Sequence, residues 1–199
     1  MRNGAGGIIE RAQAWGVERI FGYAGDGVDP LLGALRRRED EIELVTARHE
    51  EMASFMATGH AKYTGEVGVC PATQGPGAVH LLTGMDDAKL DGKPVVAIVG
   101  HVVTTALGSG YQQEVQLPTL YKDVCSSYVG ELVSLQQLDQ VVDDAFRTAL
   151  AISSPTCIIV PHDIQQAEMP EIEHADGRRH PGRALVPGQW AEGFPHGPS

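Results

Sequence analysis

A histidine followed by two glutamates is the first feature of the sequence that could do chemistry. His49, Glu50 and Glu51 open a segment of helical spacing directly after the apolar run 42–45. The run begins like the zinc-protease motif HExxH, but position 53 is Ala, so no metal ligation is expected on this helix. Both carboxylates could simply complement the helix dipole, which stabilises by about 0.3–1 kcal/mol each. A functional carboxylate at a strand-to-helix turn is the alternative, and the residues alone leave both open.

Short glycine turns are the second feature. Each of these turns has the pattern GxG, and a dinucleotide-binding fingerprint GxGxxG would require a third glycine three residues after the second. None of the turns has that glycine. The sequence also lacks the phosphate loop GxxxxGK[ST]. By themselves these segments therefore indicate tight turns, and they are Gly25-Asp26-Gly27, Gly75-Pro76-Gly77 and Gly108-Ser109-Gly110.

Histidines and cysteines add little when they are considered singly. His60, His80 and His101 are isolated, and such histidines are more often structural than ligating. The three cysteines are odd in number and form no CxxC pair, which argues against a disulfide framework or a zinc knuckle. Cys70 and Cys157 lie inside apolar runs, where we expect reduced, buried thiols.

Short β-rich runs that alternate with helical patterns must position these residues. The order predicts an α/β fold, a doubly wound, mostly parallel six-stranded sheet flanked by helices, with ligands beyond the carboxyl ends of the strands. Expected strands are 19–23, 42–45, 67–70, 95–99, 126–129 and 157–160; expected helices are 8–15, one from Asp29, 49–64, one through 81–85, and 135–152. This domain takes residues 1–168, and the Pro- and Gly-rich residues 169–199 are expected to be a linker or disordered tail.

Composition limits the possible partners. The 199 residues carry a formal charge of −11, which argues against nucleic acid as the main partner. No apolar run approaches the roughly 20 residues that cross a bilayer, and the first ten residues contain no signal-peptide pattern. A cytoplasmic location is therefore expected.

Taken in order, the motifs resemble a known family. Gly25-Asp26, Arg48-His49-Glu50, 73–77 (TQGPG) and 108–114 (GSGYQQE) look like the N-terminal pyrimidine-binding (PYR) domain of thiamine-diphosphate enzymes. The likeness covers about residues 5–168 and is greatest for the branch of pyruvate oxidase, quinone-dependent pyruvate dehydrogenase and acetolactate synthase. These are oxidoreductases and transferases that act on 2-oxo acids, and pyruvate is the substrate that the resemblance favours.

The resemblance implies a role for particular residues. Glu50 matches the family's glutamate that hydrogen-bonds the pyrimidine nitrogen N1′ and so helps to remove the thiazolium C2 proton. Gln113 matches a glutamine that faces the thiazolium and the substrate, although Gln112 stands where this branch usually has Phe. The expected cofactor-binding residues are Gly25, Glu50, Thr73, Gly75, Pro76, Gly77 and His80.

The resemblance also implies that this chain holds only the pyrimidine end of thiamine diphosphate. In the family, Mg²⁺ and the diphosphate are held by a second (PP) domain with a GDG motif and a later Asn-Asn, and FAD by a middle domain. This chain has its one GDG in the first turn, and its one Asn is Asn3. We expect an excised, truncated or separately encoded PYR domain that is inactive alone and that self-associates or meets a PP-domain partner. The alternatives are the PYR subunit of a two-chain decarboxylase and a non-catalytic interaction or regulatory module.

Overall fold

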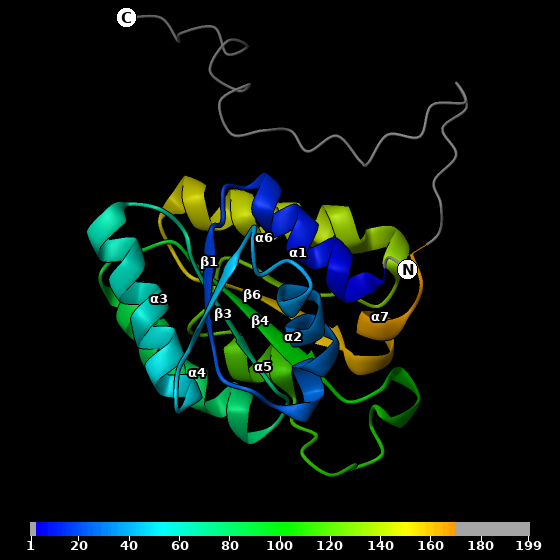
Figure 1. The fold of residues 1–199 in the computed structure, drawn as a ribbon. Helices are drawn as coiled ribbons and strands as arrows, with labels where there is room; N and C mark the ends of the chain where they lie inside the picture. Colours follow the sequence, from blue (N-terminus) through cyan, green and yellow to red (C-terminus); the bar gives the residue numbers. More distant parts are fainter. Residues whose placement is uncertain (1–2, 170–199) are drawn as a thin grey trace, which may run out of the picture.

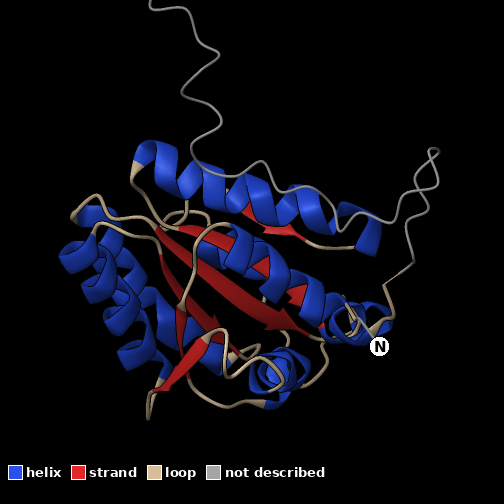
Figure 2. Cartoon of the chain, turned by 45° about the horizontal axis from the view of Figure 1, so that its top comes forward, coloured by secondary structure: helices blue, strands red, loops and turns tan. Residues whose placement is uncertain are grey.

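A layer of parallel strands lies between two layers of helices in the computed structural model, which describes residues 3–169 (Figure 1, Figure 2). The strands are β1 (Arg19–Gly22), β2 (Glu43–Thr46), β3 (Gly68–Ala72), β4 (Val95–His101), β5 (Val129–Glu131) and β6 (Thr156–Pro161). The helices are α1 (Gly4–Ala14), α2 (Asp29–Arg36), α3 (Glu50–Thr64), α4 (Pro76–Leu90), α5 (Leu117–Tyr121), α6 (Leu138–Ile152) and α7 (His162–Gln166). Short 3-10 turns lie at Asp26–Val28, Thr104–Ala106 and Leu135–Gln137.

The strands form two hydrogen-bonded ladders. β1 pairs with β2, while β3, β4, β6 and β5 pair in that order, and all these pairings are parallel. The sequence predicted one six-stranded sheet; in the part described here β1 lies beside β3 without a ladder between them. Pro71 of β3 has no N–H to donate, and a Cβ on Gly22 of β1 would lie 3.0 Å from its ring carbon Cγ. Side-chain packing therefore replaces backbone pairing at this position.

Alternate strand residues enter two hydrophobic cores, one on each face. Ile20, Val69 and Ile98 pack with α1, α2 and α6. Cys70 and Ala97 pack on the other face with α3, α4 and α5. Figure 1 shows α1 and α6 on one side of the strands, and α3 and α4 on the other. The alternation follows the two-residue period of a strand that is covered on both faces.

The predicted fold class is confirmed, with local differences. The edge strand expected at 126–129 begins instead at Val129, because Tyr128 N–H donates to the Cys125 carbonyl and closes a turn there. The short helices α5 and α7 were not predicted, since five residues are too few for a helical period to be visible. The tail predicted over 169–199 lies, apart from Met169, outside the described residues. Within 3–169 no helix has both the length and the apolar character to cross a bilayer.

The order of the strands identifies one position for a ligand site. β2 lies on one side of β1 and β3 on the other, so the direction of winding changes between β1 and β3. In open parallel sheets, ligands bind beyond the carboxyl ends of the strands at such a switch point. The segments that follow β1, β2 and β3 carry Gly25, Glu50 and Thr73 to this edge.

Candidate functional site

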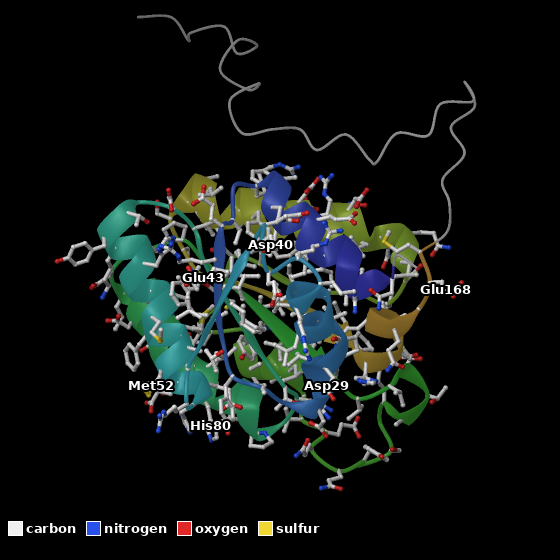
Figure 3. All side chains as sticks on the ribbon, in the orientation of Figure 1. Asp29, Asp40, Glu43, Met52, His80 and Glu168 are labelled. Carbon is white, nitrogen blue, oxygen red and sulfur yellow. The ribbon has the colours of Figure 1, made fainter. Side chains whose placement is uncertain are left out.

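Glu50 is a buried carboxylate at the start of α3. It follows the N-cap residue His49, and only 6% of its surface is exposed. Its Oε2 lies 3.0 Å from Nδ1 of His80 on α4, while Oε1 faces Gly77, where an added Cβ would lie 3.0 Å away. The carboxylate is thus held between the first turns of two adjacent helices, with His80 at the lower end of the view in Figure 3.

The turn that follows β3 presents backbone rather than side chains to this carboxylate. Gly75 has φ +62°, a conformation that favours glycine. A Cβ on Gly75 would lie 2.7 Å from the carbonyl oxygen of Gln113, and one on Gly77 would lie 2.7 Å from Cγ2 of Thr73. Pro76 sits in the first turn of α4, where its missing N–H leaves no helical bond unmade. Glycine at 75 and 77 therefore lets Gln113, Thr73 and the Glu50 carboxylate approach the backbone of this turn closely.

Thr73 ties the turn after β1 to the turn after β3. Its Oγ1 accepts a hydrogen bond from Gly27 N–H at 2.9 Å and donates to Asp26 Oδ1 at 3.0 Å. A Cβ on Gly25 would lie 2.7 Å from the Thr73 Cβ, so the two turns are in direct contact. This contact brings Gly25 to the same edge as Gly75.

Gln113 reaches the site on a loop that Glu114 holds closed. The Glu114 carboxylate accepts hydrogen bonds from the N–H groups of Gly108, Gly110 (2.8 Å) and Tyr111 (3.0 Å). These bonds, that from Gly108 most of all, lower the pKa of Glu114 below its usual value, and His101 contributes in the same direction. Gln113 has φ +63°, strained for a residue with a side chain, and its backbone packs on Gly75.

This loop should loosen in acid. The ionised Glu114 is favoured in the folded chain, so its contribution is complete above the usual carboxyl pKa and is lost as pH falls through the lowered value. Hydrogen exchange corrected for intrinsic rates should show protection at Gly108, Gly110 and Tyr111 that disappears over that range. Glu114→Gln should remove the pH dependence, whereas Glu43→Gln on β2 should keep it. Unchanged exchange in Glu114→Gln would contradict this role.

All the residues predicted from the sequence to form the site lie around this edge. Glu50 with His80 and Gly77, Gly75 with Gln113, and Gly25 with Thr73 are the three contacts that join them. His60 and His101 keep structural partners, since His60 lies 3.2 Å from Glu66 and His101 Nδ1 accepts from Val102 N–H.

His49 also lies at this edge, although it was not among the expected catalytic or cofactor-binding residues. Its ring packs on that of His80 with centroids 4.3 Å apart, and its Nδ1 accepts from Glu51 N–H at 3.3 Å. The absence of a second histidine at position 53, one helical turn away, had argued against metal ligation, but α4 brings His80 to the same place. The position of His49 directly before Glu50 was its sign in the sequence.

Cysteine chemistry can be set aside for this site. Cys70, Cys125 and Cys157 are free and buried, and burial had been predicted for Cys70 and Cys157. Burial raises the pKa of Cys70 to about 12, and it raises the pKa of the other two thiols as well. Thiols of this kind are unreactive at neutral pH.

The fold and the site together define an α/β domain that presents glycine backbone and a buried carboxylate at a switch point. Residues 2–120 match the family described as thiamine pyrophosphate enzyme, N-terminal TPP binding domain. The chain belongs to this family.

Curated relatives agree with this assignment. Pyruvate oxidase of Lactiplantibacillus plantarum is 34% identical over 163 residues, which are 82% of this chain and 27% of the oxidase. The large subunit of acetolactate synthase isozyme 2 of Escherichia coli is 39% identical over 166 residues, 83% of this chain and 30% of the synthase. Chloroplastic acetolactate synthase of Arabidopsis thaliana is 34% identical over 167 residues, 83% of this chain and 24% of that protein. This chain therefore spans less than a third of each of the three.

Proposed function

We propose that residues up to 168 are the PYR domain of a thiamine-diphosphate enzyme that decarboxylates a 2-oxo acid, with pyruvate the first candidate. The observation that carries this proposal is the buried Glu50 carboxylate beside the backbone of Gly75 and Gly77. A flat aminopyrimidine suits this turn, because glycine lets a ring approach the backbone and a carboxyl group can share a proton with a ring nitrogen. Family membership and relatives that act on pyruvate support it.

Each residue then has a definite task. Glu50 hydrogen-bonds the pyrimidine nitrogen N1′ and shares a proton with it. Thr73 holds the turns after β1 and β3 together, and His80 holds the Glu50 carboxylate by Oε2 so that Oε1 stays directed at Gly77. Gln113 lies on the substrate side. The bound cofactor supplies the electron sink for decarboxylation, and the protein supplies placement and this proton contact.

A chimaera tests the proposal. Residues 3–169 would replace the N-terminal domain of Lactiplantibacillus plantarum pyruvate oxidase, which supplies the remaining domains of that enzyme. Pyruvate-dependent decarboxylation by a folded chimaera that binds thiamine diphosphate supports the proposal. A folded chimaera that binds the cofactor through its other domains and has no activity favours the non-catalytic module. The chain alone should bind thiamine diphosphate only weakly, with Mg²⁺ and any FAD held by other domains. A two-chain decarboxylase remains the second candidate for how those domains are supplied.

The surface beside Glu50 is apolar, which supports an interface there. Met52, Phe55 and Val79 are 51%, 43% and 45% exposed and lie on α3 and α4, the helices that carry Glu50 and His80. Figure 3 labels Met52 and His80 at the same end of these helices. Exposed apolar surface of this kind marks interaction sites. We propose that a second copy of the chain, or a PP domain, covers it.

Self-association should therefore depend on this surface. Analytical ultracentrifugation of the 199-residue chain should show dimers whose fraction rises with concentration, and Met52→Ser with Phe55→Ser should weaken the dimer by about tenfold or more, since each loses apolar burial. Ile152→Ser, an exposed apolar residue at the end of α6, is the matched control and should leave it unchanged. A monomer at all concentrations in the parent chain would count against the interface.

A further inference from the structure

We propose that His49, Glu50 and His80 form a binding site for a divalent transition-metal ion of the Zn²⁺ type. One ligand atom from each of the three side chains lies within 4.8 Å of the others. The sequence brings them from two helices, His49 and Glu50 from the start of α3 and His80 from the first turns of α4. The structure therefore assembles a donor set that no single-helix motif contains.

The spacing of the donors is near that of a tetrahedral ion. Bonds of about 2.0–2.1 Å to zinc place neighbouring ligand atoms about 3.3 Å apart. Glu50 Oε2 and His80 Nδ1 are already 3.0 Å apart. The ring of His49 is packed against that of His80 at 4.3 Å between centroids. To coordinate the ion, the ligand nitrogen of His49 has to move at most about 1.5 Å toward the other two ligand atoms, and rotation of its side chain can supply this movement.

The types of donor select the ion. Two imidazoles and one carboxylate suit Zn²⁺, Co²⁺ or Ni²⁺, whereas Mg²⁺ and Ca²⁺ prefer sets made of oxygen atoms only. Glu50 is buried, but 41% of the His80 side chain is exposed, so an ion can enter from solvent. Three protein ligands leave a fourth position for water.

Coordination by His49 has a structural consequence. Its Nδ1 now accepts the long 3.3 Å bond from Glu51 N–H that caps α3. If Nδ1 binds the ion, its lone pair no longer accepts the hydrogen bond from Glu51 N–H. If Nε2 binds the ion, the ring proton moves onto Nδ1, which again can no longer accept. The cap is lost in both cases. Metal binding should therefore release the Glu51 N–H, an effect that can be followed by hydrogen exchange.

The ion would also exclude the cofactor from the same carboxylate. This part rests on the proposed function, since it requires that Glu50 meets the pyrimidine. An ion bound to the Glu50 carboxylate would take the lone pairs that are to meet the ring nitrogen. Zn²⁺ would then compete with thiamine diphosphate.

The test is titration of the untagged 199-residue chain with Zn²⁺ and Co²⁺. His174, His180 and His196 are first replaced by alanine, so that donors outside the described part of the chain do not contribute. One Zn²⁺ per chain by calorimetry, tetrahedral Co²⁺ absorption and faster exchange at Glu51 are expected. His80→Ala and Glu50→Gln should each weaken binding by about tenfold or more. His60→Ala, which removes a histidine paired with Glu66, should leave binding unchanged.

The outcomes separate this inference from the proposed function. No stoichiometric binding, or equal Zn²⁺ affinity in the parent and His80→Ala chains with circular dichroism showing both folded, overturns the metal site. Tetrahedral binding that the variants weaken supports it even if the pyruvate oxidase chimaera is inactive. An active chimaera from a chain that binds no Zn²⁺ would leave the proposed function standing alone.

Discussion

Glu50→Gln in the chimaera is expected to lower pyruvate decarboxylation by about 10²–10⁴-fold, the usual range for loss of a positioned acid or base. Glutamine keeps the size of the side chain but cannot share a proton with the ring nitrogen. Its amide can still meet His80 and Gly77, so the fold should survive. The measurement is the steady-state rate at saturating thiamine diphosphate, with circular dichroism to verify folding.

Glu51→Gln is the matched control for this change. Glu51 lies one residue further along α3 and has the same charge, but it is only half-buried, and its backbone N–H rather than its carboxylate takes part in the cap. Its substitution should change the rate by less than about threefold if Glu51 only complements the helix dipole. Equal rates for the parent and Glu50→Gln chimaeras would remove Glu50 from the proposed mechanism.

Gly84→Ala is expected to destabilise the chain by about 1–3 kcal/mol, because overpacking between two helices forces them apart. A Cβ at this position of α4 would collide with the Ser54 side chain and lie 2.5 Å from the backbone nitrogen of Phe55 on α3. The neighbouring backbone cannot rotate away as a side chain can. The displacement of α3 would also move Glu50 relative to His80.

Gly59→Ala makes the same chemical change on α3 with the opposite expected sign. Nothing lies within 4 Å of a Cβ there, so alanine should stabilise the helix by about 0.5–1 kcal/mol. Urea unfolding of both variants measures the two effects, and the melting temperature should shift by about 2–4 °C for each kcal/mol. If both variants changed the stability in the same direction, the close contact between α3 and α4 would not be the reason that position 84 requires glycine.

Local sequence patterns predicted most of the helices and strands. The features that were not predicted depend on contacts between residues far apart in the sequence. The continuous apolar run 95–99 predicted a buried parallel strand, and Asp29-Pro30 marked the start of α2. The separation of the sheet into two ladders was not visible, because it depends on Pro71 lying opposite Gly22, almost fifty residues away. Periodicity reports which face of an element is buried and not which neighbour covers it.

The same limit applies to the site. The resemblance predicted its residues, and they do lie at one edge of the strands. It did not predict that Glu50 and His80 meet at 3.0 Å, since they lie thirty residues apart in the sequence with α3 and β3 between them. The closure of the loop by Glu114 was equally hidden, because three backbone N–H groups converge on it only when Gly108 and Gly110 take positive φ.

The missing ladder between β1 and β3 leaves this boundary of the described strands without backbone pairing. Within each ladder of the described strands, neighbouring strands are joined by backbone hydrogen bonds. Between β1 and β3, the contacts are those of the Pro71 ring and of aliphatic side chains. The Thr73 hydroxyl, which forms hydrogen bonds with Gly27 and Asp26, links the turn after β3 to the turn after β1. A molecule that binds between these two turns would therefore contact both ladders at the place where packing and turn contacts join them.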